Sequence, residues 1–134
     1  MTDPANQPKL TFVSPFFIVR DVRPTIAFYR DQLGFELTYL NSEDDPFFAI
    51  VVRDGAQLML KAIAPEILPQ PNATRHPSAA WDAYFHAPDP DGLASELAAR
   101  GVELHAPLEN RDDQLRGFEV RDPDGYVLFF GRPL

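Results

Sequence analysis

The sequence predicts an α+β fold in which two βαβββ modules pair into a cupped mixed sheet with the helices outside. Three observations predict it. The order of strand, helix and three strands occurs twice, short sequence matches recur about half a chain length apart, and one proline-rich stretch separates the copies. A βαβββ module leaves an open apolar face and strand edge, so two modules are expected to close against each other.

The first copy is expected over residues 10–61. Residues 11–19 are apolar and rich in β-formers, which predicts the first strand. Asp21 is a suitable N-cap for the helix that follows, and Gly34 is a suitable left-handed stop. The remaining strands are predicted at 35–40, 47–52 and 57–61.

The second copy is expected over residues 80–133. Its strand, helix and three further strands are predicted at 80–86, 90–100, 102–105, 117–121 and 127–131. Two matches support the duplication: Gly34-Phe-Glu-Leu37 resembles Gly101-Val-Glu-Leu104, and Val52-Arg-Asp54 resembles Val120-Arg-Asp122. The final strands align at a slightly longer offset because the second hairpin turn is longer. Repeats of this kind indicate an internal duplication.

The domain organisation follows from these copies. Residues 1–9 are expected to be a flexible tail, residues 10–134 a single domain, and the proline-rich residues 62–79 the linker between copies. No apolar run is long enough for a membrane span, and residues 1–9 lack the apolar region of a signal peptide. We therefore expect no membrane partner and a cytoplasmic protein, in keeping with the absence of cysteine.

The charge balance narrows the classes of partner. The chain has 12 Lys and Arg against 20 Asp and Glu, which gives a net charge of −8. A nucleic-acid-binding surface needs clustered cations to neutralise phosphates, and no such cluster is present in the sequence. We therefore expect no nucleic-acid partner, and the acidic surface favours cationic ligands over anionic ones.

Two motifs carry a family resemblance. The run from Ala27 to Phe35, AFYRDQLGF, and the run from Arg121 to Tyr126, RDPDGY, resemble the opening helix and closing hairpin of the vicinal oxygen chelate superfamily. This superfamily includes glyoxalases, bleomycin-resistance proteins and dioxygenases. The resemblance covers nearly the whole chain. It implies a homodimer with binding crevices at or near the subunit contact.

Enzymes of this superfamily hold a divalent metal with one residue from the first and last strand of each copy. The resemblance places those four positions at Ser14, Met59, Asp82 and Phe129. Divalent ions at such sites are bound by carboxylate oxygen or imidazole nitrogen, and catalytic sites usually have three protein ligands. One carboxylate does not meet that requirement. We therefore expect no metal and no cofactor, as in the bleomycin-resistance branch.

A binding surface is predicted inside the cup. Asp82, Tyr84 and His86 alternate along one strand and therefore share a face. The full predicted ligand-binding set is Ser14, Phe16, Met59, Trp81, Asp82, Tyr84, His86 and Phe129. The predicted function is metal-independent binding of a small molecule, sequestering a cationic or aromatic compound. The alternative is an enzyme: a metal-dependent lyase, transferase or dioxygenase, or a metal-free enzyme with Asp82 or His86 as acid or base. A dimeric interaction module with a filled cup is a third reading.

Overall fold

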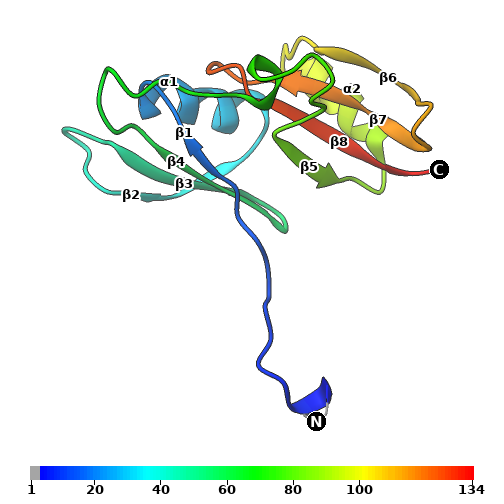
Figure 1. The fold of residues 1–134 in the computed structure, drawn as a ribbon, viewed down its shortest axis with the longest axis horizontal. Coiled ribbons are helices and arrows are strands. Elements are labelled where there is room, and N and C mark those ends of the chain that lie inside the picture. The colour runs from blue at the N-terminus through cyan, green and yellow to red at the C-terminus, as the bar shows by residue number, and fades with distance from the viewer. Residues whose placement is uncertain (1–3) are drawn as a thin grey trace.

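The computed structural model describes residues 4–134, which form two modules that each pair one helix with one sheet (Figure 1). The first module contains β1 (Phe16–Ile18), α1 (Val22–Ala27), β2 (Glu36–Leu40), β3 (Phe48–Arg53) and β4 (Ala56–Lys61). The second contains β5 (Ala83–His86), α2 (Pro90–Ala99), β6 (Ala106–Asn110), β7 (Leu115–Arg121) and β8 (Val127–Pro133). Short 3-10 helices, Pro4–Asn6 and Asn72–Thr74, lie outside the modules.

The two sheets have the same topology. Their strand orders are β1-β4-β3-β2 and β5-β8-β7-β6. In each sheet the first strand pairs in parallel with the last, and the other neighbours are antiparallel. The predicted α+β class and the repeated βαβββ order are therefore confirmed. Within the described residues the sheets are two separate hydrogen-bonded units, because no strand pair joins one to the other.

Helix α1 starts and stops at the predicted signals, and α2 stops at the predicted glycine. The Asp21 side chain accepts a hydrogen bond of 3.0 Å from a backbone N–H in the first turn of α1. Helix α1 continues as a π-helical turn, Phe28–Gln32, and the chain then leaves the helix at Gly34 with φ +75°. Asp89 and Gly101 have the same roles in α2. Of the helices described, none is long and apolar enough to cross a bilayer.

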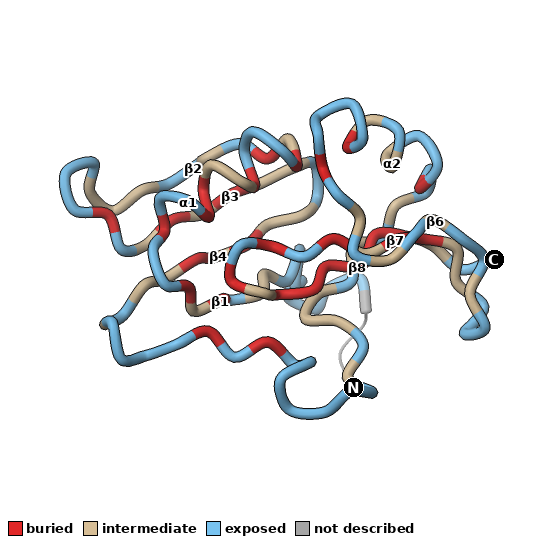
Figure 2. Tube along the Cα trace, turned by 90° about the horizontal axis from the view of Figure 1, so that it is seen from above, coloured by how far each residue is buried: buried red, intermediate tan, exposed pale blue. Residues whose placement is uncertain are grey.

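One continuous core lies between the helices and the sheets. Buried positions follow α1, β3 and β4 in the first module and β7 and β8 in the second (Figure 2). The sheet residues in it include Phe17, Ala49, Val51, Leu58, Leu60, Phe118, Val120, Leu128 and Phe130. These positions alternate along their strands, so the residues between them lie on the opposite, open faces. The predicted site residues on the strands lie on these open faces.

Polar contacts join the two modules through buried side chains. The Tyr29 hydroxyl of the first module donates to the Asp122 carboxylate at 2.8 Å, and the Thr25 hydroxyl donates to Asp124 at 2.9 Å. At the opposite side, Arg53 makes two hydrogen bonds of 2.8 Å to the Glu96 carboxylate on α2. Bidentate pairs of this kind fix orientation as well as distance. The modules are therefore held by directional contacts in addition to the apolar core.

The first strand is shorter than predicted. Residues 11–19 were expected to be extended and paired, yet β1 covers only Phe16–Ile18. Phe16 is opposite Met59, so at this register residues before Val13 lie beyond the first residue of β4 and find no partner there. The segment before β1 instead runs away from the body of the molecule (Figure 1). Its Leu10, Phe12 and Val13 side chains are exposed.

A second difference concerns the strand after α2. The sequence predicted a strand at 102–105, whereas β6 is Ala106–Asn110. The backbone N–H of Val102 donates to the carbonyl of Leu97 at 2.9 Å, and the Val102 side chain is buried. The apolar residues of this segment thus close the end of α2 and pack beneath it. Apolar character alone does not distinguish this packing from a strand.

Candidate ligand-binding site

The predicted residues lie at matching positions of the two modules. Phe16 is opposite Met59 in the β1–β4 pair, and Tyr84 is opposite Phe129 in the β5–β8 pair. The sequence repeat relates these pairs, because Phe16 aligns with Tyr84 and Met59 aligns with Phe129. Equivalent positions of the two sheets are therefore occupied by predicted site residues. The structure places one pair in each sheet, and no hydrogen bond or ring contact joins the two pairs within the described residues.

An aromatic cluster occupies the open face of the second sheet. The ring centroids of Trp81 and Phe129 are 4.5 Å apart and nearly parallel, and those of Tyr84 and Phe129 are 5.5 Å apart. Trp81 and Tyr84 also contact each other, with centroids 5.7 Å apart. Phe129 at the centre is fully buried, while Tyr84 is 42% exposed. Offset stacking at these distances is favourable.

Two glycines make room for the Phe129 ring. Gly117 and Gly131 are direct cross-strand partners in β7 and β8. A Cβ atom on Gly117 would lie 2.5 Å from the Phe129 ring, and one on Gly131 would lie 2.6 Å from it. The ring therefore lies over a part of the sheet where side chains are missing. Glycine within a strand commonly marks such a close approach.

A charged pair covers one side of the cluster. The Cζ atom of Arg111 lies 5.2 Å from the Phe129 ring centroid and 5.7 Å from that of Trp81. Its Nη1 donates to Glu119 at 2.8 Å, and the Trp81 indole N–H donates to the same carboxylate oxygen at 3.2 Å. The hydrogen bond to Glu119 raises the pKa of Arg111 further above its ordinary value. Arg111 is therefore a permanent cation over an aromatic surface.

Asp82 binds the linker between the modules. Its Oδ1 accepts a hydrogen bond of 2.7 Å from the backbone N–H of Asn72, and its Oδ2 accepts one of 2.8 Å from that of Val127. Both oxygens are thus engaged by the main chain. The carboxylate joins the linker helix Asn72–Thr74 to the start of β8.

The first module presents its predicted residues on a more open apolar face. The Phe16 and Phe48 ring centroids are 6.2 Å apart, and those of Tyr39 and Phe48 are 5.9 Å apart. Phe16 is 52% exposed, and Met59 beside it is partly buried. The Ser14 hydroxyl is directed to backbone carbonyl oxygens, including that of residue 57 at 3.3 Å. This face is apolar and only partly covered.

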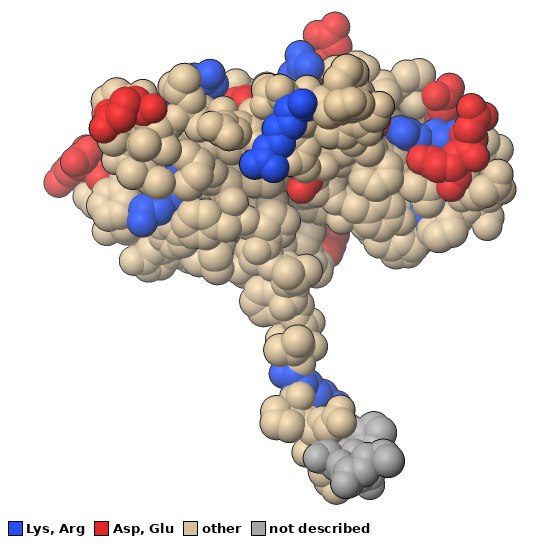
Figure 3. All heavy atoms as spheres, viewed as in Figure 1, with Lys and Arg blue, Asp and Glu red and all other residues tan. Residues whose placement is uncertain are grey.

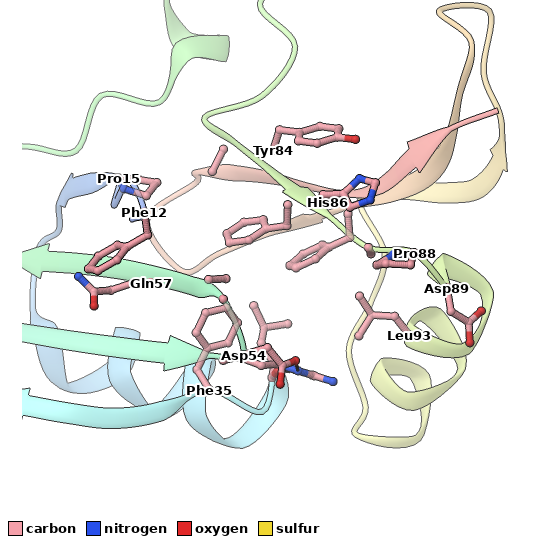
Figure 4. A pocket seen from close by; sticks show the side chains of 18 of the residues that line it. Phe12, Pro15, Phe35, Asp54, Gln57, Tyr84, His86, Pro88, Asp89 and Leu93 are labelled. Atoms are coloured by element: carbon pink, nitrogen blue, oxygen red, sulfur yellow. Dashed lines mark hydrogen bonds and ion pairs between the residues drawn. The ribbon is translucent and has the colours of Figure 1, made fainter. Parts of the chain in front are cut away.

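A cavity of about 1020 Å³ lies between the modules. Phe12 and Pro15 of the N-terminal segment border it on one side, and Tyr84 and His86 of β5 border it on the other (Figure 4). Small-molecule sites commonly have volumes of roughly 300–1,000 Å³. The His86 imidazole makes no hydrogen bond or ion pair with any described residue. Tyr84 belongs both to this cavity and to the aromatic cluster, so the two features are contiguous.

The four positions that the resemblance assigns to a metal do not fit one. Phe129 has no donor atom, Met59 has a soft thioether, and the hydroxyl of Ser14 faces backbone carbonyls. Both oxygens of Asp82 accept backbone hydrogen bonds. Within residues 4–134, no group of three or more His, Asp or Glu side chains is arranged to hold a metal ion.

Sequence reasoning missed the polar half of the aromatic cluster. Arg111 and Glu119 were not among the predicted residues, although both contact Trp81. The signal that points to this place in the sequence is the pair Gly117 and Gly131, each within a predicted strand. Arg111 itself lies in a polar loop with no distinguishing pattern. Its position follows from the fold of the β6–β7 hairpin.

A comparison with models of protein families shows to which family the chain belongs. The model of the Glyoxalase/Bleomycin resistance protein/Dioxygenase superfamily matches residues 11–130. The chain belongs to this superfamily. The membership inferred from the two sequence motifs is thus confirmed, and the structural repeat is that of the superfamily. A comparison with curated proteins finds no match.

Several solved structures share the superfamily fold. TioX from Micromonospora sp. ML1 superposes with a TM-score of 0.70 at 18% identity, covering 92% of this chain and 98% of TioX. The bleomycin-binding protein of bleomycin-producing Streptomyces verticillus, solved with copper(II)-bleomycin, has a TM-score of 0.67 at 27% identity, covering 92% and 97%. TnmS3, an antibiotic binding protein from Streptomyces sp. CB03234, has a TM-score of 0.65 at 21% identity, covering 96% and 98%.

Proposed function

We propose that this chain is a metal-independent small-molecule binding protein of the superfamily, one that sequesters an aromatic or cationic compound. One observation carries the proposal. Where the resemblance places the fourth metal ligand, the chain has Phe129, a fully buried ring stacked with Trp81 and Tyr84. The cluster offers no metal donor, and its partly exposed Tyr84 ring leaves aromatic surface on which a planar ligand can stack.

Similarity and charge support the same proposal. The Streptomyces verticillus bleomycin-binding protein is 27% identical over nearly the whole of both chains. The net charge of −8 favours the approach of cationic ligands through the long-range field of the protein. The cavity between the modules, about 1020 Å³, is large enough for a drug-sized molecule.

We also propose that the protein is a homodimer whose binding crevices form at the subunit contact. The open face of the first module carries the half-exposed rings of Phe16 and Tyr39, and the segment before β1 exposes Leu10, Phe12 and Val13. Exposed apolar side chains in such numbers are typical of interaction sites. A second subunit would cover this face and complete the partly open cavity. Light scattering coupled to size-exclusion chromatography should give twice the chain mass.

A metal-free enzyme has less support. An acid or base needs a free proton-accepting atom within reach of a substrate, and both oxygens of Asp82 are engaged by backbone N–H groups. His86 borders the cavity, yet no described side chain orients its imidazole. We therefore favour binding over turnover.

The single tryptophan allows a direct test. Trp81 lies in the cluster, so its fluorescence reports on ligand binding there. We expect metal-free bleomycin to quench it in a saturable way, with the same affinity in EDTA as after addition of Ni²⁺, Mn²⁺ or Zn²⁺. Phe129→Leu should weaken binding, while Phe47→Leu, a change of an exposed ring outside the cluster, should not. Binding that appears only with metal, or turnover with metal, would contradict the proposal.

A further inference from the structure

The guanidinium of Arg111 lies where a planar cationic ligand would stack. It is within 5.2 Å of the Phe129 ring centroid and 5.7 Å of the Trp81 centroid. Both distances are within the roughly 6 Å over which a cation is attracted to an aromatic face. The Arg111 side chain is 25% exposed, whereas Phe129 is fully buried. Arg111 therefore contributes to the cover that separates this ring from solvent.

The carboxylate opposite Arg111 is fixed by the sheet. Glu119 is the direct cross-strand partner of Phe129 in the β7–β8 pair. Its Oε2 accepts from both the Arg111 guanidinium, at 2.8 Å, and the Trp81 indole, at 3.2 Å, and its side chain is only 13% exposed. If Arg111 moved away, the Trp81 hydrogen bond and the strand position of Glu119 would still hold the carboxylate beside the rings.

Arg111 itself comes from a more adaptable part of the structure. It follows the last residue of β6 and begins the short loop that leads to β7. A long side chain on a hairpin loop reaches the rings from outside, whereas Glu119 and Phe129 stand on the strands. Acidic atoms surround a patch of basic atoms over the β6–β7 end of the molecule (Figure 3). Asp113 forms an ion pair with Arg111, with its Oδ2 3.4 Å from the Arg111 Nε.

The charged groups around Arg111 determine which class of ligand this place favours. Arg111 supplies one positive charge, and Glu119 and Asp113 supply two negative charges within 3.4 Å of it. Arg111 is therefore already neutralised, so a carboxylate or phosphate ligand would compete with Glu119 and Asp113 for it. If Arg111 moved out, both carboxylates would lose their ion-pair partner, and Glu119 would remain beside the rings with its hydrogen bond from the Trp81 indole. That environment suits a cation with a flat π-surface.

We propose that Trp81, Phe129 and Glu119 form a subsite for a planar organic cation, such as an amidinium or a protonated heteroaromatic amine. In the unliganded protein Arg111 occupies this subsite and acts as an internal competitor, which the ligand displaces. The inference rests on the proposed binding function and specifies its ligand class. Arg111 is then the residue that sets affinity and selectivity at this end of the site.

The test compares two flat tricyclic probes at about pH 7.5, where 9-aminoacridine is a cation and acridine is neutral. Affinities are measured by calorimetry and by quenching of Trp81. Wild type should prefer the cation. Replacing the competitor in Arg111→Met should tighten binding of 9-aminoacridinium by about tenfold, the scale of a desolvated cation–π contact, and change acridine binding much less. Glu119→Gln should abolish the preference between the two probes.

Arg121→Met is the matched control. It removes the same charge from an exposed residue on β7 that makes no ion pair within the described chain, so its affinities should stay close to those of wild type. If Arg111→Met does not fold, Arg111→Lys replaces it, because lysine lacks the planar fork and should be displaced more easily.

Four outcomes would overturn the inference. Weaker binding of 9-aminoacridinium by Arg111→Met would make Arg111 a ligand contact instead of a competitor. A preserved charge preference in Glu119→Gln would assign the selectivity elsewhere. If acridine and metal-free bleomycin bind but no variant shows a charge preference, the binding function stands and the subsite fails. If no probe binds to any variant, the proposed function fails together with the subsite.

Discussion

Tyr29 and Asp122 are 93 residues apart in the sequence, yet the Tyr29 hydroxyl donates a 2.8 Å hydrogen bond to the Asp122 carboxylate in the buried contact between the modules. The other oxygen of Asp122 accepts from the backbone N–H groups of Asp124 and Tyr126. The same residues therefore shape the tight turn before β8 and connect that turn to α1. The motif RDPDGY, which resembles a plain hairpin in the sequence, is also a contact between modules.

Removing the Tyr29 hydroxyl should destabilise the fold. In Tyr29→Phe the buried Asp122 loses the one side-chain donor it has among residues 4–134, and the free energy of unfolding should fall by about 1–3 kcal/mol. Urea unfolding at neutral pH measures this change. Tyr39→Phe is the control, because the Tyr39 ring is half exposed and its hydroxyl makes no hydrogen bond within the described chain. Equal stability of the two variants would argue against the buried contact.

The same carboxylate should make stability depend on pH. Burial raises the pKa of Asp122 from 3.8 to about 6, against the lowering effect of the hydrogen bonds from Tyr29 and the backbone. Between these values the folded protein holds a proton that the unfolded chain has released. The free energy of unfolding should therefore decrease as pH rises from about 4 to about 6, by at most roughly 3 kcal/mol.

Asp122→Asn tests that assignment, because the amide does not titrate. Its unfolding free energy should lack the decrease between about pH 4 and 6 that wild type shows. A separate loss is expected at lower pH, since hydrogen bonds from Arg53 lower the pKa of Glu96 and that stabilisation disappears as Glu96 is protonated. An unchanged slope in Asp122→Asn would assign the pH dependence to another group.

The glycines beneath the aromatic cluster should tolerate no side chain. In Gly131→Ala the new Cβ would meet the carbonyl oxygen of Arg116 and approach the Phe129 ring to 2.6 Å. Overpacking of this kind costs about 1–3 kcal/mol. The near-ultraviolet circular dichroism of Trp81 should change as well, because the stack must shift. Gly55→Ala, where a Cβ meets nothing within 4 Å, should leave both stability and spectrum almost unchanged.

Asp82 should act as an anchor for the linker. Asp82→Ala removes the acceptors for the Asn72 and Val127 N–H groups, so amide hydrogen exchange around residues 70–80 should accelerate. Metal-free bleomycin should still quench Trp81 in this variant. Asp112→Ala, at an exposed loop position, is the control for loss of one negative charge. Loss of ligand binding with an unchanged linker would instead favour the role predicted from the sequence.

Much of the fold was predictable because its signals are local or repeated. Asp21, Gly34 and Gly101 are caps and stops whose physics depends on neighbouring backbone alone. The repeat offset also relates Met59 to Phe129, and the structure places these two residues at matching positions, opposite Phe16 in the first sheet and opposite Tyr84 in the second.

Other features depend on contacts that a linear pattern does not contain. The length of β1 is limited by where β4 starts, and the segment at 102–105 packs under α2 although its composition suits a strand. The alternation of residues predicts that Asp82 faces the cup, yet its carboxylate accepts hydrogen bonds from two backbone N–H groups. Arg111 reaches the aromatic cluster from the loop between β6 and β7, a position that depends on how this hairpin folds.

The glycine pair beneath Phe129 also constrains how this protein could change. Replacing Phe129 by Glu or His would supply a donor atom but would leave the hollow above Gly117 and Gly131 empty and remove the ring on which Trp81 stacks. Replacing Gly117 or Gly131 first is equally unfavourable, because the Phe129 ring already occupies the space that a new side chain would need. Metal binding is therefore several coupled substitutions away from this sequence, and a laboratory selection for it should randomise positions 117, 129 and 131 together.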